Sequence, residues 1–324
     1  MQAERTPLPT LTSPIAVALS EGRRVLTSEL TPPIGSDLDE VLAQGRQVLG
    51  LVDAVHVNDN LLAIARCSPL AVCARLKLDG IEPVFQMSLR HRNRIQVQSD
   101  ILAAAALGIR TMLIMTGYPI HIGSDPEAVD ASDLDTDETL RRLRTLVDKG
   151  TLFGGGKVVG EPPDLFIGAV DNLIADEPES RVDVIEAKVS AGARMIQIQG
   201  VFYLEPLKRL MAAVRDRGLH ERVPFMAGVL PFRSLDHLRE RASNTGQMIP
   251  TKLVDYLESH SDPNVGLQII EELAAGALAI EGIRGLHIRS QGYEECVSPI
   301  VEMLRKEGLI ATAAESQSST KATA

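Results

Sequence analysis

The stretch Phe85-Gln-Met-Ser-Leu-Arg-His-Arg-Asn-Arg94 indicates the fold class of this 324-residue chain. An apolar run over residues 81–84 leads into it, and a helix-like segment over residues 95–107 follows it. Its arginines therefore lie at the carboxyl end of an expected strand, the edge where α/β barrels bind ligands. Because guanidinium groups match phosphate and carboxylate oxygens, the stretch predicts an anion site. The alternative is an exposed loop whose arginines pair with nearby aspartates and glutamates.

The same alternation of an apolar run and a helix-period segment repeats along the chain. The expected strands cover residues 25–31, 54–57, 83–88, 110–116, 165–170, 195–199, 224–230 and 285–288. The expected helices cover residues 37–49, 94–107, 137–147, 181–191, 205–217, 235–242 and 293–307, with one more within 61–78. Eight alternations predict an α/β fold, a (β/α)8 TIM barrel. The alternative, a doubly wound sheet, lacks support because no glycine-rich dinucleotide fingerprint follows the first strand.

Two long segments interrupt the regular alternation. Residues 120–164 follow the fourth strand and residues 244–277 follow the seventh, so we expect insertions after both strands. Residues 1–310 are expected to form one barrel domain, and the small, polar residues 311–324 a disordered tail.

Composition limits the class of protein. The chain is 44% hydrophobic and 23% charged, which is typical of soluble globular proteins. A net charge of −10 argues against nucleic-acid or anionic-membrane partners. The three cysteines, Cys67, Cys73 and Cys296, lack zinc-site spacing and indicate free thiols in a reducing compartment. Because no signal-peptide pattern or membrane-spanning apolar run is visible, we expect a cytoplasmic protein. The histidines show no metal-binding spacing, so no metal is expected.

Glu29 is the candidate acid. It lies inside the apolar strand Val25–Leu30 and has no basic neighbour close in the sequence. Burial destabilises an ionised carboxylate, so we expect Glu29 to stay protonated near neutral pH and to donate a proton. The alternative is a glutamate that pairs with an arginine across the barrel.

Two further positions carry polar groups toward the expected ligand edge. Gln197 and Gln199 face the same way on their strand, either into the barrel or toward the helix layer. Gly200 then permits a close backbone approach, and interior amides near this edge commonly bind ligands. Lys188 lies on an expected helix, where most lysines are solvated.

Taken together, these stretches resemble the methylenetetrahydrofolate reductase family, most of all its short bacterial form with only the catalytic barrel. The similar stretches occur in the family order from about residue 25 to residue 309. They are Ser28–Pro33, Val55–Asn60, Pro83–Arg94, Ser99–Arg110, Thr116–Gly117, Ala187–Ala193, Gln199–Phe202 and Ala227–Pro231.

The resemblance implies a reaction: 5,10-methylenetetrahydrofolate is reduced to 5-methyltetrahydrofolate by NADH or NADPH through a bound flavin, FAD or FMN. It implies that Glu29 is the acid that opens the imidazolidine ring, and that Gln199, Asp59 and Phe202 bind the folate. The cofactor-binding residues that it implies are Asn58, Gln86, Ser88, Arg90, Arg92, Asn93, Thr116, Gly117, Tyr118, Ala169 and Lys188. The expected partner is the small folate, and the family is compatible with a homo-oligomer or a complex with a partner subunit.

The sequence also departs from the family near the cofactor. Tyr118 stands where the family has an aspartate after Thr-Gly, His91 replaces an acid in the arginine run, and Tyr203 replaces another aspartate. Residues 170–174 lose the usual flavin-loop pattern. Three interpretations stay open: a flavoenzyme with an altered potential, a flavin-independent reductase or paralogue acting on another one-carbon folate, and a folate- or flavin-binding subunit of a larger complex.

Overall fold

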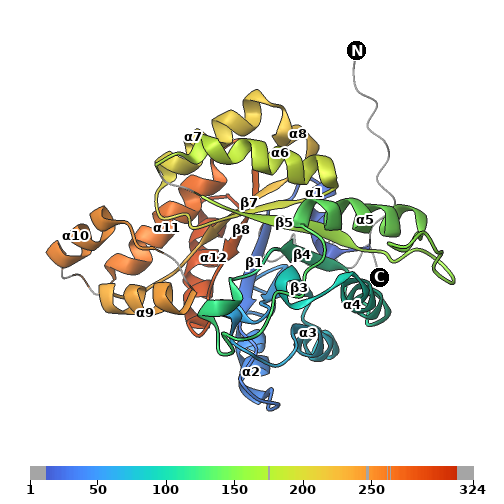
Figure 1. Cartoon of the computed structure of the whole chain (residues 1–324). Helices are drawn as coiled ribbons and strands as arrows, with labels where there is room; N and C mark the ends of the chain where they lie inside the picture. The colour runs from blue at the N-terminus through green and yellow to red at the C-terminus, as the bar shows by residue number, and fades with distance from the viewer. Residues whose placement is uncertain (1–11, 174–175, 246–247, 261, 263, 312–324) are drawn as a thin grey trace.

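The computed structural model describes residues 12–173, 176–245, 248–260, 262 and 264–311 (Figure 1). Eight parallel strands pair in sequence order and close into a barrel, which confirms the predicted (β/α)8 fold. The tail expected over residues 311–324 lies outside the description apart from Ala311, and so does Ile174 of the segment that departs from the family.

The strands lie where the sequence predicts them, with bounds that differ by at most two residues. They are β1 Val25–Leu30, β2 Ala54–Val57, β3 Pro83–Ser88, β4 Thr111–Met115, β5 Phe166–Asn172, β6 Ile196–Gln199, β7 Phe225–Val229 and β8 Ile283–Ile288. Their side chains are almost all buried, as expected for parallel strands covered on both faces.

Helices surround this barrel (Figure 1). They are α1 Pro14–Ser20, α2 Asp39–Gln47, α3 Pro69–Leu78, α4 Arg94–Ala106, α5 Thr136–Lys149, α6 Val182–Ala191, α7 Leu204–Asp216, α8 Leu219–Arg222, α9 Leu235–Thr245, α10 Thr251–Ser259, α11 Val265–Leu278 and α12 Val297–Lys306. The insertion after β4 carries a short 3-10 helix, Ile120–Ile122, and α5, and the insertion after β7 carries α10 and most of α11. Among the described helices, none is both long and apolar enough to cross a bilayer.

An apolar floor closes the amino-terminal end of the barrel. Ile15 and Ala18 of α1, which the sequence did not predict, pack there against side chains from six strands. Those side chains belong to Val25, Ala54, Val84, Phe166 and Met226, together with Leu113 of the layer above; Met195, which precedes β6, joins the same cluster. The amino-terminal end is therefore filled, and a ligand can approach only from the carboxyl ends of the strands, as in other barrels.

Above this floor the interior side chains form three layers of four, each from alternate strands. The lower layer is His56, Leu113, Gln197 and His287, and the middle layer is Glu29, Gln86, Val170 and Gly228. Each middle-layer residue pairs in register with a lower-layer residue of the next strand. The upper layer, at the mouth, is Asn58, Met115, Gln199 and Arg289. Barrel interiors are usually filled by bulky branched residues, so these polar layers indicate a site.

Candidate functional site

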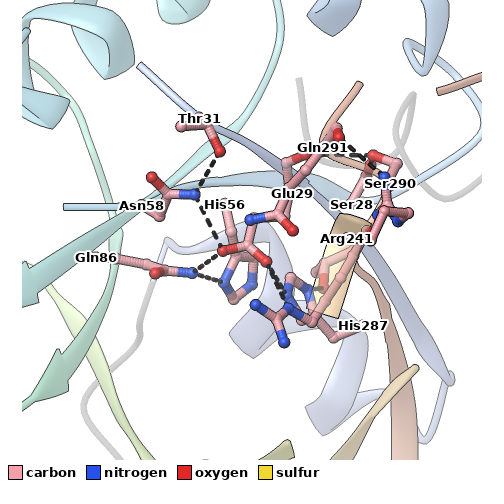
Figure 2. A network of polar contacts seen from close by, with 12 residues as sticks. Ser28, Glu29, Thr31, His56, Asn58, Gln86, Arg241, His287, Ser290 and Gln291 are labelled. Atoms are coloured by element: carbon pink, nitrogen blue, oxygen red, sulfur yellow. Dashed lines mark hydrogen bonds and ion pairs between the residues drawn. The ribbon is translucent and has the colours of Figure 1, made fainter. Parts of the chain in front are cut away.

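Glu29 lies at the centre of a network of donors inside the barrel (Figure 2). The side chain is nearly fully buried, at 2% exposed. Its Oε2 accepts from Arg289 Nε and lies near His287 Nε2, both at 3.2 Å. Its Oε1 accepts from Gln86 Nε2 at 3.4 Å and from Asn58 Nδ2 at 3.5 Å. Residues at the ends of β2, β3 and β8 thus converge on one carboxylate.

The surroundings keep this carboxylate ionised. Burial alone would raise the pKa of Glu29, but the hydrogen bond from His287 and the positive charge of Arg289 lower it well below its ordinary value. The expectation of a protonated acid is therefore wrong for the ligand-free protein. The alternative, a glutamate paired with an arginine, is what the structure shows, because β1 and β8 are neighbours in the closed barrel.

Two buried histidines extend the network downward. Their rings lie side by side, with centroids 4.3 Å apart. His287 Nδ1 lies 2.9 Å from the hydroxyl of Thr27, and His56 Nδ1 accepts from Gln86 Nε2 at 3.2 Å. Burial lowers the pKa of His56 well below its ordinary value, so His56 is neutral and carries its proton on Nε2. Neither histidine was predicted as a site residue, although each occupies an interior position of its strand.

Several buried polar atoms around this network lack a hydrogen-bond partner within the described part of the chain. They are His56 Nε2, Asn58 Oδ1, Ser88 Oγ, both amide atoms of Gln197, and Arg289 Nη1. Native proteins rarely leave such atoms unpaired without a reason. The barrel mouth therefore offers donors and acceptors that suit a polar ligand.

In this structure the arginines of residues 90–94 pair with carboxylates, which is the alternative to an anion site. Arg90 binds Asp130 at 2.5 Å, and Arg94 binds Asp133 at 2.6 Å. Arg92 is buried between Asp59, which accepts from its Nη1, and Asp100, at 2.7 Å from its Nε. Each guanidinium thus pairs with a carboxylate, and the run holds the end of β3 against its neighbours. Its anion binding stays a prediction.

The predicted residues outside the network have structural partners. Asp59 accepts from Ser88 N at 2.8 Å as well as from Arg92. Lys188 donates to Val170 O at 2.7 Å and pairs with Asp171 at 2.5 Å. Asp171 also binds Arg181. These contacts hold the rim together, so a ligand would have to compete with them.

The remaining predicted residues divide between mouth and scaffold. Gln199 lies in the upper layer at the mouth. Phe202 is half-buried and packs against the hydrophobic core between the barrel and the helices. Asn93 caps α4, since its side chain accepts from Ile95 N at 3.0 Å. Thr116 Oγ1 lies 3.0 Å from Thr136 Oγ1. The side chain of Ala169 packs in the core between barrel and helices, so it faces away from the mouth.

Tyr118, the main departure from the family, lies beside the network. Burial raises its pKa, Arg289 lowers it, and Glu29 raises it further, so both charged groups act on this phenol. The side chain that replaces the family aspartate is therefore close to the central ion pair.

Gly117 makes the closest approach at this edge. Its φ is +92°, and a Cβ there would lie 1.8 Å from Ser88 Oγ. We expect Gly117→Ala to lower the free energy of unfolding by about 1–2 kcal/mol more than Gly155→Ala, the scale of overpacking. Gly155 is a matched control, because its φ is +91° and no described atom lies within 4 Å of its Cβ position. Urea denaturation measures both, and equal losses would contradict the contact.

The fold and this network define an α/β-barrel protein with a polar ligand site at the carboxyl ends of its strands. The family model for methylenetetrahydrofolate reductase matches residues 15–305. The chain therefore belongs to the methylenetetrahydrofolate reductase family, as its motifs predict.

Solved structures share the fold. An uncharacterised protein from Clostridium thermocellum, which binds two copies of 5-methyl-5,6,7,8-tetrahydrofolic acid, superposes with a TM-score of 0.59 at 15% identity, over 89% of this chain and 97% of that one. Tryptophan synthase from Mycobacterium tuberculosis superposes with a TM-score of 0.52 at 13% identity, over 94% of this chain and 100% of that one. At these identities the likeness shows the barrel alone.

Proposed function

We propose that this protein binds a reduced folate at the barrel mouth and reduces 5,10-methylenetetrahydrofolate to 5-methyltetrahydrofolate with NADH or NADPH. The buried Glu29 carboxylate, held by Arg289 and His287, is the observation that carries the proposal. Family membership supports the reaction class. The folate bound by the Clostridium thermocellum protein supports the ligand class.

The chemistry requires a stabilised cation. When the bond between the one-carbon unit and N10 breaks, N10 takes a proton supplied by the solvent, and an iminium cation forms between the carbon and N5. A hydride then adds to this carbon and gives the N5-methyl group. A fixed carboxylate in a water-poor site stabilises such developing positive charge. Glu29 is placed for this role, and its ionised state suits it better than proton donation.

The flavin implied by the family fits these residues poorly. Phosphates are usually held by arginine and lysine, but Arg90, Arg92 and Lys188 are each paired with a carboxylate. Tyr118 lies near the ion pair where the family has an aspartate. These contacts favour direct transfer of hydride from the nicotinamide to the folate. Transfer through FAD or FMN is the second candidate, which the family motifs at Asn58 and Gln86 favour.

One measurement separates the two candidates. We expect protein purified without added flavin to show no flavin spectrum, yet to oxidise NADH or NADPH only when methylenetetrahydrofolate is present and to form 5-methyltetrahydrofolate. Wild-type protein stripped by dialysis and then supplied with FAD is the control. A yellow protein whose activity depends on FAD would support the second candidate. Folate binding without turnover under either condition would overturn the proposed function in favour of a binding subunit.

A further inference from the structure

Gln197 is a buried polar side chain that the proposed reaction does not use. It lies on β6 in the lower layer and is 0% exposed. Neither amide atom has a hydrogen-bond partner among the described residues. A buried, unpaired amide destabilises the folded protein, so its presence calls for a ligand or another functional reason. From the sequence, Gln197 faces either the barrel interior or the helix layer, and ligand binding was predicted only for Gln199; the structure places Gln197 in the interior.

The groups around Gln197 complete a set of donors and acceptors. His56 Nε2 in the same layer and Arg289 Nη1 in the upper layer are also buried and unpaired within the described structure. The neutral His56 and the cationic Arg289 both offer donors, and Gln197 offers one donor and one acceptor. Figure 2 shows the contact between Gln86 Nε2 and His56 Nδ1. The second ring nitrogen of His56, Nε2, therefore stays available for a ligand.

Gly228 is the one member of the middle layer that has no side chain above Gln197 and His287. The other members of the middle layer, Glu29, Gln86 and Val170, carry side chains, but Gly228 on β7 carries none. Its neighbouring strands are β6 and β8, which hold Gln197 and His287 in the layer below. No side chain from β7 therefore lies in the middle layer, and the Cβ position that Gly228 leaves empty is bordered by Ile198 O and Gln199.

We propose that Gln197 determines specificity for the pterin ring by binding its pyrimidinone edge, and this inference rests on the proposed function. An amide can donate to the C4 carbonyl oxygen and accept from N3–H in two parallel hydrogen bonds. N5 is peri to the C4 carbonyl, so this contact places N5 and its one-carbon group beside the C4 oxygen, next to the middle layer. Glu29 in the middle layer then faces the nitrogen where positive charge develops.

Gln197→Met tests the proposal, because methionine has a similar volume and no amide. We expect the affinity for 5-methyltetrahydrofolate, measured by calorimetry, to fall at least about tenfold, the scale of lost hydrogen bonds in a site built to make them. The Tm of the ligand-free variant should be no lower than that of wild type, since an unpaired amide is removed.

Gln98→Met is the matched control. The amide of Gln98 is fully engaged, with Arg94 O at 2.8 Å and Phe153 N at 2.7 Å. It lies on α4, away from the barrel interior. This variant should lose stability and keep wild-type affinity for the folate, the opposite of the effects expected at Gln197.

Two ligand fragments locate the effect on the ring. Tetrahydropterin should lose the same factor of affinity as 5-methyltetrahydrofolate in Gln197→Met, whereas p-aminobenzoylglutamate, which lacks the ring, should lose none. Wild-type affinity of Gln197→Met for the folate and the pterin would overturn the inference alone. Failure of the wild-type protein to bind any reduced folate would instead overturn the proposed function, and with it this inference.

Discussion

Glu29→Gln is expected to lower folate reduction by about 100-fold or more, the scale of one lost electrostatic contact to a transition state. The amide keeps the shape of the side chain, and its oxygen can accept from one pair of the surrounding donors while its NH2 group faces the other pair, but it has no charge to stabilise the iminium cation. Affinity for 5-methyltetrahydrofolate, which carries no such cation, should stay near that of wild type. Steady-state kinetics and calorimetry measure the two effects, and near-wild-type turnover would remove Glu29 from the mechanism.

The pH profile distinguishes a stabilising anion from a proton donor. The pKa of Glu29 is lowered, so the group is ionised throughout the neutral range and protonates only in acid. An anion therefore causes no loss of kcat as the pH rises through neutrality. A donor with a raised pKa would cause such a loss, and Glu29→Gln would abolish it. A falling limb that this variant removes would contradict the ionised state.

The barrel could be predicted from the sequence because each of its strands is locally marked. Buried parallel strands are continuous apolar runs, and the run that leads into Phe85–Arg94 is bounded by a cluster of charges at its end. The 7-residue α1 could not be predicted in this way. It is too short for helical periodicity to be recognised in the sequence. Its apolar residues are buried only through contacts with the barrel floor, which the sequence does not show.

The chemical state of the site depends on contacts that the sequence does not show. Glu29 and Arg289 lie 260 positions apart and meet only because the last strand closes on the first. In the same way, Asp130 and Asp133, the partners of Arg90 and Arg94, lie in an insertion whose path local patterns do not fix. Site residues could therefore be placed at the mouth from strand ends, but their charges could not.

Arg289→Met should destabilise the protein strongly. It leaves the buried Glu29 without its arginine partner, and removal of one partner from a buried ion pair loses about 3–5 kcal/mol. The segment that follows β8 should keep its structure, because Arg241 donates to the main-chain carbonyls of Arg289 and Gln291. The substitution does not remove these carbonyls. Arg94→Met is the matched control. Its pair with Asp133 is exposed, and such pairs contribute about 1 kcal/mol or less.

The pH dependence of that loss tests its cause. In wild type the lowered pKa of Glu29 contributes stability that is present above its ordinary value of 4.5 and is lost as the pH falls below it. Without Arg289 one of the causes that lower the pKa of Glu29 is lost, so this pKa rises toward its ordinary value and the variant should lose less stability in acid than wild type does. Glu29→Gln in the same chain should restore most of the loss at neutral pH. If urea denaturation finds the double variant as unstable as Arg289→Met, then the loss comes from packing rather than from an unpaired carboxylate.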